Sequence, residues 1–141
     1  MTPEAGRYLE KARRCLAHAR AILGIALGEE AGRSAYLTAF HAAQALIFER
    51  LGTVARSHQG VHGEFAKLAK NEPSIDPDLR RFLSQAYDLK VLADYETGPE
   101  AVVPLERAAA AVDAAERFLD CVAQLVERSA PATPGKSPIK R

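Results

Sequence analysis

Apolar side chains recur every three to four residues along most of this chain, which is the spacing of one face of an α-helix. No proline lies between Pro3 and Pro73, so long uninterrupted helices are permitted there. The pattern predicts an all-α fold. Its five helices are expected to run over about Pro3–Ala26, Arg33–Arg50, Ser57–Asn71, Pro77–Ala93 and Val102–Arg128.

Glycine, proline and capping residues mark the expected helix ends. Residues 28–32, Gly-Glu-Glu-Ala-Gly, are predicted to form a short break, so that the two flanking helices pack as antiparallel neighbours. Gly52 is predicted to end the second helix in the left-handed conformation. Ser57 and the pair Asp76-Pro77 are typical of helix N-termini. Thr97-Gly98-Pro99 is expected to break the chain before the last helix.

One face of each predicted helix is apolar and is expected to contribute to a shared core. In the first two helices this face consists of Tyr8, Ala12, Cys15, Ala19, Leu23, Tyr36, Phe40, Ala43 and Ile47. The third and fourth helices contribute Phe65, Leu68, Leu79, Phe82, Leu83, Ala86 and Leu89. The last helix contributes Leu105, Ala108, Val112, Ala115, Leu119, Val122 and Val126.

The composition agrees with this pattern and excludes several classes of protein. Aromatic residues make up only 6% of the chain and Trp is absent, whereas Ala and Leu are abundant, as is typical of helical proteins. With 19 basic and 18 acidic residues, the molecule as a whole does not attract nucleic acid or acidic membranes. The longest apolar stretch, residues 21–27, is too short to span a bilayer. We expect a cytoplasmic protein without a membrane segment or a disulfide scaffold.

The chain has 141 residues, which is the length of one domain. Its last stretch, residues 131–141, contains three prolines and three basic residues but no acidic residue. Such a segment cannot bury enough apolar surface to fold. We therefore predict one helical domain over residues 1–130 and a disordered, basic, proline-rich tail over residues 131–141.

The histidines are the first candidates for chemistry. His58 and His62 lie four residues apart, so they share one helix face, as two metal ligands on a helix do. Gln59 and Gly60 stand where a zinc-protease helix would carry its glutamate. Because nothing supplies the remaining ligands, we expect neither a metal nor another cofactor.

Arg56 and His62 form a second candidate pair, with five residues between them. An imidazole can shuttle a proton and a guanidinium can stabilise the charge of a phosphorane, so the pair suits metal-free RNA cleavage. The alternative is a solvated junction between a loop and a helix.

Several other polar residues have both a structural and a functional interpretation. His41 lies on a largely apolar helix, where a hydrogen-bonded packing role is the simpler one. Tyr95 is either a core residue with a hydrogen-bonded hydroxyl or a site of modification, and packing is the safer assumption. Lys90 and Asp94 are four residues apart and are expected to form an ordinary helix ion pair.

Basic side chains recur along the first helix at helical spacing, at Arg7, Lys11, Arg14 and His18. Such a row can contact phosphates. Glu4 and Glu10 interleave with it, so a mixed solvated surface is the favoured interpretation.

Three segments taken together resemble a known family. They are residues 35–46 (AYLTAFHAAQAL), residues 56–61 (RSHQGV) and residues 93–95 (ADY). In this order they are similar to the small stand-alone HEPN proteins of prokaryotes, and the resemblance covers about residues 5–128. It implies an up-and-down bundle of four or five helices that commonly forms a homodimer.

The resemblance also implies a function. HEPN proteins of this kind are often encoded beside a minimal nucleotidyltransferase. The HEPN member is typically an RNase toxin, and the nucleotidyltransferase is its antitoxin, which in some cases transfers AMP to a tyrosine of the toxin.

Active members of the family carry an Arg, then four to six residues, then a His, with a Tyr two residues after the His. The most similar segment here is residues 90–95, where Lys90 replaces the Arg and Asp94 replaces the His. An aspartate with an ordinary pKa is ionised near pH 7 and is a poor general acid. The resemblance therefore implies a degenerate catalytic motif.

These observations leave two main hypotheses. In the first, the chain is a module of a toxin–antitoxin-like pair that binds a nucleotidyltransferase, RNA or a nucleotide in a dimer groove formed by His41, His58, Lys90, Asp94 and Tyr95. In the second, it is a metal-independent endoribonuclease that uses Arg56 and His62. A third possibility is a purely structural helical dimer. The sequence leaves open whether the protein is an enzyme.

Overall fold

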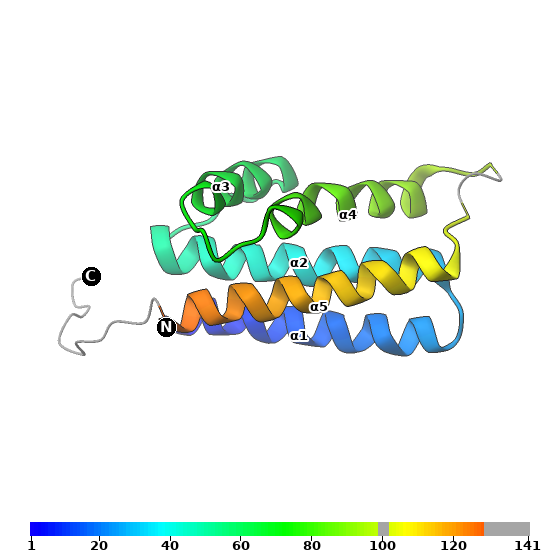
Figure 1. The fold of residues 1–141 in the computed structure, drawn as a ribbon, viewed down its shortest axis with the longest axis horizontal. Coiled ribbons are helices and arrows are strands. Elements are labelled where there is room, and N and C mark those ends of the chain that lie inside the picture. Colours follow the sequence, from blue (N-terminus) through cyan, green and yellow to red (C-terminus); the bar gives the residue numbers. More distant parts are fainter. Residues whose placement is uncertain (99–101, 129–141) are drawn as a thin grey trace.

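Five α-helices contain most of the residues that the computed structural model describes, residues 1–98 and 102–128. They are α1 (Pro3–Gly24), α2 (Gly28–Leu51), α3 (His58–Lys70), α4 (Pro77–Tyr95) and α5 (Leu105–Arg128), as Figure 1 shows. The described residues form no β-strand, and none of these helices is both long and apolar enough to cross a membrane. The prediction of an all-α bundle is confirmed.

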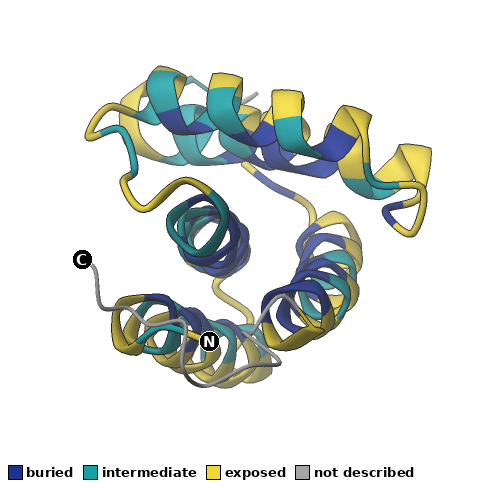
Figure 2. Cartoon of the chain, turned by 90° about the vertical axis from the view of Figure 1, so that its left-hand side faces the viewer, coloured by how far each residue is buried: buried dark blue, intermediate teal, exposed yellow. Residues whose placement is uncertain are grey.

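Helix α2 lies at the centre of the bundle and contacts each of the other four helices. Figure 2, seen along the bundle, shows α2 between α1 and α5 on one side and the α3–α4 pair on the other. α1 and α2 run antiparallel, as the short connection predicts (Figure 1). Most of the buried residues of α2 are alanines and glycines, and such small side chains let its neighbours approach closely.

The connection between α1 and α2 differs from the prediction. Residues 28–32, expected to be a break, form the first turns of α2, and residues 25–27 make the turn instead. Gly28 is buried, and a Cβ atom at this position would lie 2.5 Å from the carbonyl oxygen of Val103. The glycine therefore allows the start of α2 to pack against the segment that precedes α5, and it does not interrupt the helix.

Two predicted helix ends are confirmed in detail. Gly52 follows α2 with a φ of 77°, and its N–H donates to the carbonyl of Phe48. Ser57 precedes α3, and its hydroxyl accepts a hydrogen bond of 2.9 Å from the N–H of Gly60. These local signals fix where α2 ends and where α3 begins.

Other ends shift by a few residues. α4 continues to Tyr95, two residues beyond its predicted end, and α5 begins at Leu105, three residues after its predicted start. The last turn of α4 therefore carries Asp94. The predicted tail, residues 131–141, and Pro99 of the predicted chain break lie outside the described residues.

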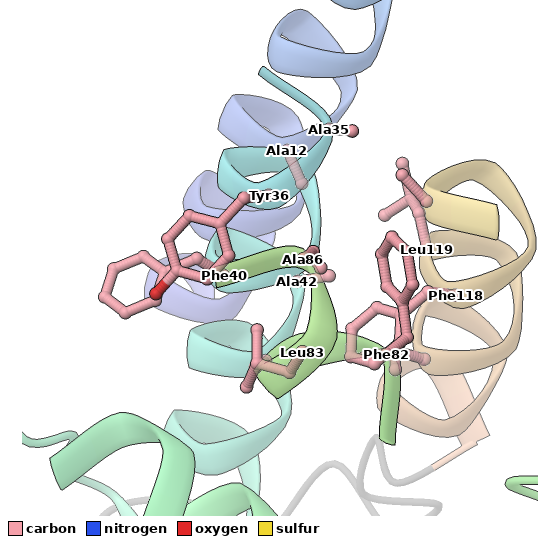
Figure 3. Packing of buried hydrophobic residues seen from close by; sticks show 14 of the residues in the cluster. Ala12, Ala35, Tyr36, Phe40, Ala42, Phe82, Leu83, Ala86, Phe118 and Leu119 are labelled. Atoms are coloured by element: carbon pink, nitrogen blue, oxygen red, sulfur yellow. The ribbon is translucent and has the colours of Figure 1, made fainter. Parts of the chain in front are cut away.

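The predicted core is largely confirmed, with additions. Figure 3 shows Phe82 of α4 beside Phe118 of α5, and their ring centroids are 6.0 Å apart. Phe118 also lies 5.3 Å from the ring of Phe65, and it is fully buried although the sequence pattern did not include it. Leu105, which the pattern placed in the core, is 45% exposed because it opens α5 at the edge of the bundle.

The buried face of α1 agrees with the prediction only in part. Ala12 and Ala19 are buried as predicted, whereas Tyr8 and Cys15 are only partly buried and Leu9, which the pattern did not include, is buried. Tyr8 packs at the margin of the core, where its ring lies 6.4 Å from that of Phe48 on α2. An aromatic side chain therefore stands at the border between α1 and α2.

Candidate functional site

Helix α2 is buried on most sides but keeps one uncovered strip. Its side chains at positions 33, 37, 41, 44 and 48 are partly exposed and follow the spacing of one helix face. Figure 2 shows a partly buried side of α2 turned to a part of the bundle that no helix covers, with α1 on one side and the α3–α4 pair on the other. We call Arg33, Leu37, His41, Gln44 and Phe48 the open strip.

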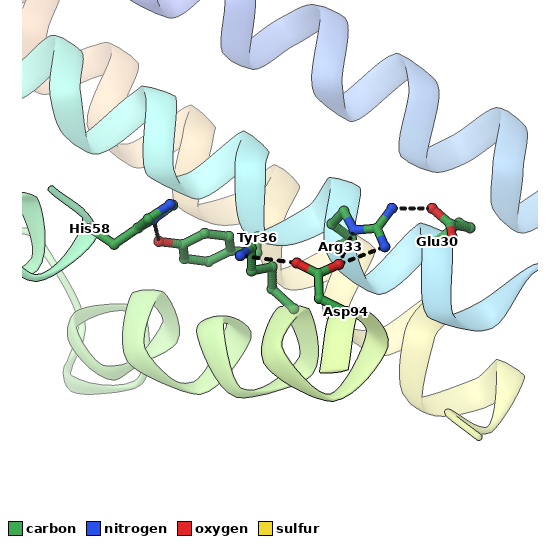
Figure 4. A network of polar contacts seen from close by, with 6 residues as sticks. Glu30, Arg33, Tyr36, His58 and Asp94 are labelled. Atoms are coloured by element: carbon green, nitrogen blue, oxygen red, sulfur yellow. Dashed lines mark hydrogen bonds and ion pairs between the residues drawn. The ribbon is translucent and has the colours of Figure 1, made fainter. Parts of the chain in front are cut away.

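Tyr36 joins α2 to α3 through its hydroxyl. Its Oη lies 2.6 Å from Nδ1 of His58 (Figure 4) and 2.9 Å from Nε2 of His62. The hydroxyl has one proton to donate, so one imidazole accepts that proton while the other donates an N–H to the same oxygen. The histidine pair with metal-ligand spacing thus converges on a tyrosine, and the described residues contain no group of three potential metal ligands.

Aromatic rings surround these hydrogen bonds. Tyr87 of α4 stands edge-on to Tyr36 and to His62, with ring centroids 5.3 Å apart in both pairs. The ring of Phe40 lies 4.6 Å from that of His58. Aromatic pairs of this kind contribute about 0.5–1.5 kcal/mol each, so α2, α3 and α4 are held together here. We call Tyr36, Phe40, His58, His62 and Tyr87 the histidine–aromatic cluster.

Burial determines the protonation of this cluster. Desolvation lowers the pKa of His58 and of His62 below the ordinary histidine value. The Lys90 ammonium lowers the pKa of His58 further, and His58 does the same to His62. Burial raises the pKa of Tyr36 well above the ordinary tyrosine value. Both imidazoles are therefore neutral, and the phenol is protonated, at neutral pH.

Beside this cluster, four charged side chains of α2 and α4 neutralise one another. The Asp94 carboxylate accepts hydrogen bonds from Lys90 Nζ at 3.0 Å and from Arg33 Nε at 2.7 Å (Figure 4). Arg33 also forms an ion pair with Glu30. The hydrogen bond from Lys90, reinforced by Arg33, holds the pKa of Asp94 below its ordinary value. We call Glu30, Arg33, Lys90 and Asp94 the ion cluster, and its two cations and two anions cancel.

Tyr95 is not a core residue, so the packing assumption was wrong. The residue is 68% exposed at the C-terminal end of α4. Its ring lies 5.5 Å from Lys90 Nζ, which also lies 5.9 Å from the ring of Tyr87. Because α4 ends in solvent, Tyr95 presents an aromatic ring beside the ion cluster.

His41 lies on the open strip between the two sides of the bundle. It is partly buried, and its Nδ1 is 2.7 Å from Oε1 of Gln44, which agrees with the expected hydrogen-bonded role. Burial lowers the pKa of His41, the hydrogen bond to Gln44 opposes this, and Lys11 and His58 lower the pKa further. Because Lys11 belongs to α1 and His58 to α3, His41 is close to both sides.

The α1 side of the open strip contains a hollow of about 330 Å³. It is lined by Glu4, Arg7, Tyr8, Lys11, Arg14 and Phe48. Arg7 lies 3.9 Å from the carboxylate of Glu4. Lys11 and Arg14 are exposed, and neither forms a hydrogen bond or ion pair with a residue that the structure describes. We call Arg7, Lys11 and Arg14 the basic edge.

The structure does not link Arg56 to His62. Arg56 is exposed two residues before α3, and within the described part of the chain its guanidinium makes no hydrogen bond or ion pair. His62 is turned to the hydroxyl of Tyr36 instead. Proton transfer by Nε2 of His62 would require that this hydrogen bond open first.

Sequence reasoning identified His58, Lys90 and Asp94 but missed two of their neighbours. Tyr87 is three residues before Lys90, so helical spacing could have placed it on the same face of α4. Arg33 gave no such signal, because 61 residues separate it from Asp94 in the sequence.

Comparisons with known proteins agree with this architecture. The family model of the HEPN domain matches residues 5–127. No curated protein sequence matches the chain. The crystal structure of TT1696 from Thermus thermophilus has a TM-score of 0.70 and 26% identity, and the match covers 87% of this chain and 98% of that one. The crystal structure of ST0689, an archaeal HEPN homologue, has the same fold, with a TM-score of 0.63, 20% identity and coverage of 89% and 99%.

Proposed function

The chain belongs to the HEPN domain family, and from this premise we propose that it is a binding module whose ligand, RNA or a nucleotide, lies along the open strip of α2. The binding groove is formed by His41, His58, Lys90, Asp94 and Tyr95. Two copies form a homodimer, as HEPN domains commonly do. The dimer acts in the cytoplasm with a nucleotidyltransferase partner in a toxin–antitoxin-like pair, as the resemblance to the small prokaryotic HEPN proteins implies.

The observation that carries the proposal is the meeting of aromatic and cationic side chains beside an uncovered strip. Tyr95 exposes its ring, and Lys90 lies near both this ring and that of Tyr87. Nucleic-acid bases stack on aromatic rings, and basic grooves follow the phosphate backbone. The ring of His58 lies 4.6 Å from that of Phe40 on α2, and His41 follows Phe40 on the open strip. The groove therefore contains aromatic rings on which a base can stack, and the ammonium group of Lys90 lies next to them.

The ion cluster supports a binding role over a catalytic one. Asp94 occupies the position at which active relatives carry their histidine. Hydrogen bonds from Lys90 and Arg33 keep its carboxylate ionised, so it has no proton to donate at neutral pH. The degenerate motif thus contributes a network of charges instead of an acid and a base.

The alternative, an endoribonuclease that uses Arg56 and His62, has less support. Nε2 of His62 is occupied by Tyr36, and Arg56 makes no contact with His62. Cleavage by this pair is one of the outcomes that the following experiment distinguishes.

The test uses the purified protein in EDTA with a fluorescein-labelled single-stranded RNA of about 12 nucleotides, within the range that one domain can hold. Fluorescence anisotropy measures binding. The Lys90→Ala/Tyr95→Ala variant should bind at least about tenfold more weakly, because base stacking on one aromatic ring is worth about 1–3 kcal/mol. Lys70→Ala removes one exposed cation from the other end of α3 and should bind like the wild type.

Three outcomes would contradict the proposal. The first is a wild-type protein that binds neither RNA, nor AMP or ATP, nor its partner nucleotidyltransferase. The second is equal loss of binding in the double variant and in Lys70→Ala, because the effect would then be one of charge alone. The third is cleavage of the RNA in EDTA that disappears in Arg56→Ala/His62→Ala, which would favour the endoribonuclease. Sedimentation of the wild type tests the homodimer.

A further inference from the structure

We infer that the basic edge of α1 belongs to the same binding surface and binds the phosphates of a single-stranded nucleic acid. The inference rests on the proposed function, since it identifies the ligand of the open strip as a strand of several nucleotides and not as a single nucleotide. Three features support it: the unpaired charges of Lys11 and Arg14, the hollow beside them, and the path that connects this hollow to the histidine–aromatic cluster.

The charges of the basic edge are available to a ligand. Arg7, Lys11 and Arg14 follow one another at helical spacing and span about 10 Å along α1, given a rise of 1.5 Å per residue. Among the residues that line the hollow, only Glu4 is acidic, and it lies 3.9 Å from Arg7. Glu10, which the sequence suggested as a neutralising neighbour, does not line it. The edge therefore retains a positive charge although the whole chain is almost neutral.

Two aromatic rings line the hollow. The rings of Tyr8 and Phe48 lie 6.4 Å apart, and both side chains are partly buried between α1 and α2. Its volume of about 330 Å³ lies at the lower end of the range of small-ligand sites, about 300–1,000 Å³. A base or sugar can pack against these rings while a phosphate contacts the neighbouring cations.

The open strip connects this hollow to the opposite side. Phe48, Gln44 and His41 follow one another on one face of α2, and they span about 10 Å along its axis. His41 is influenced by the charge of Lys11 from α1 and by His58 from α3. A strand that lies along the strip can therefore place its phosphates on the basic edge and its bases against the rings of α3 and α4.

Two other ligands fit this arrangement less well. A single nucleotide needs donors that converge on its phosphates, whereas the three cations stand in a row along α1. A lipid surface needs apolar side chains that protrude, whereas Tyr8 and Phe48 are partly buried. A row of cations above aromatic rings suits an extended polyanion with planar bases.

The experiment measures binding of the full-length protein to the labelled RNA over a series of salt concentrations. Lys11→Gln/Arg14→Gln should reduce the slope of log K against log salt by about 1.4, because each phosphate contact with a single strand contributes about 0.7. Arg13→Gln/Arg117→Gln is the charge-matched control, since both residues are exposed and neither lines the hollow. Its slope should equal that of the wild type. All four positions are exposed, and thermal unfolding verifies that each variant keeps its fold.

The outcomes separate the inference from the proposed function. If the wild type binds RNA but Lys11→Gln/Arg14→Gln has the wild-type slope, the inference is overturned while the proposed function stands. The same holds if the two double variants reduce the slope by the same amount. Complete displacement of the RNA by millimolar AMP or inorganic phosphate would also overturn it, because the site would then hold a single phosphate group. Loss of binding to anionic vesicles, with RNA binding unchanged, would assign the edge to membranes. A wild type that binds no RNA overturns the inference, and it overturns the proposed function as well if it also binds neither AMP or ATP nor the nucleotidyltransferase.

Discussion

The two sides of the open strip contain the same kinds of residue but use them differently. On the α3–α4 side, both imidazoles of the histidine–aromatic cluster share the hydroxyl of Tyr36, and Lys90 is paired with Asp94. On the α1 side, Lys11 and Arg14 form no hydrogen bond or ion pair within residues 1–98 and 102–128. The first side is neutral and internally bonded, and the second is cationic and open.

This difference shows that the role of a polar side chain depends on whether it has a bonding partner within the protein. Removing one member of a buried hydrogen bond leaves the other unsatisfied, at a cost of about 1–3 kcal/mol. Removing an exposed charge usually changes the free energy of unfolding by less than about 0.5 kcal/mol. Substitutions within the buried hydrogen bonds of the histidine–aromatic cluster should therefore change stability, whereas substitutions of exposed side chains, such as those of the basic edge, should change binding.

The largest effect is expected for Tyr36→Ala. This change removes a fully buried ring together with the hydroxyl that two imidazoles share, so the free energy of unfolding should fall by about 3–5 kcal/mol in urea denaturation. Tyr95→Ala is the matched control, because Tyr95 is 68% exposed, and it should change the value by less than about 0.5 kcal/mol. Similar losses of unfolding free energy in the two variants would contradict the proposed difference between buried and exposed side chains.

The second prediction concerns the pH dependence of stability. The pKa values of His41, His58 and His62 lie below the ordinary histidine value of 6.5, so the unfolded chain binds more protons than the folded one as the pH falls below 6.5. Stability is therefore complete above this pH and declines below it. Since the imidazoles are partly exposed and screened, we expect a loss of about 1–2 kcal/mol between about pH 7 and 5.5.

Thermal unfolding over this pH range provides the measurement, and His62→Gln should show a flatter profile than the wild type. Asp94 does not contribute to the change in stability over this pH range. Its pKa is also lowered, but from an ordinary value of 3.8, so its contribution is lost only at more acidic pH. Stability that rises as the pH falls from about 7 to 5.5 would contradict the assignment of neutral imidazoles.

The third prediction concerns a substitution that gives the α3–α4 side a net positive charge, like that of the α1 side. Asp94→Asn removes the carboxylate between Lys90 and Arg33, so the ion cluster gains a positive charge. The loss of stability should stay below about 1 kcal/mol, since these pairs are near the surface. RNA binding in the anisotropy assay should become a few times stronger. Asp120→Asn, an exposed position on α5, is the charge-matched control, and weaker RNA binding in Asp94→Asn would refute the expectation.

The smallest effect is expected in the pKa of a single histidine. The ammonium of Lys11 lowers the pKa of His41, so Lys11→Gln should raise it, as measured by NMR titration. His62 serves as the internal control, because Lys11 is not among the groups that act on it. A shift at His62 of the same size as at His41 would show that the charge of Lys11 is felt equally on both sides of the strip.

Much of the fold could be predicted from local patterns. The helical spacing of apolar residues located all five helices, and Ser57 and Gly52 marked helix ends, because capping depends on groups within one turn. The prediction failed at residues 28–32, where Gly28 allows close packing against Val103 instead of breaking the helix. It also failed at Tyr95, because a tyrosine at the end of a helix is buried only if another element covers it.

The candidate site could be predicted only in part. His58, Lys90 and Asp94 were identified from their residue types and from the resemblance to a family, and their positions on α3 and α4 follow from helical spacing. Their partners on other helices could not be identified in this way. Tyr36 is 22 residues from His58, and Arg33 is 61 residues from Asp94.

The sequence by itself determined the five helices, most of their apolar faces and the residues able to carry charge, because these properties depend on neighbours within a few positions. Only the tertiary structure decided which charges on separate helices are paired. Arg33 and Arg14 are residues of the same type, yet Nε of Arg33 on α2 lies 2.7 Å from the carboxylate of Asp94 on α4, whereas Arg14 on α1 is exposed to solvent. The distance between groups on separate helices sets this difference, and packing of α2 against its neighbours fixes that distance.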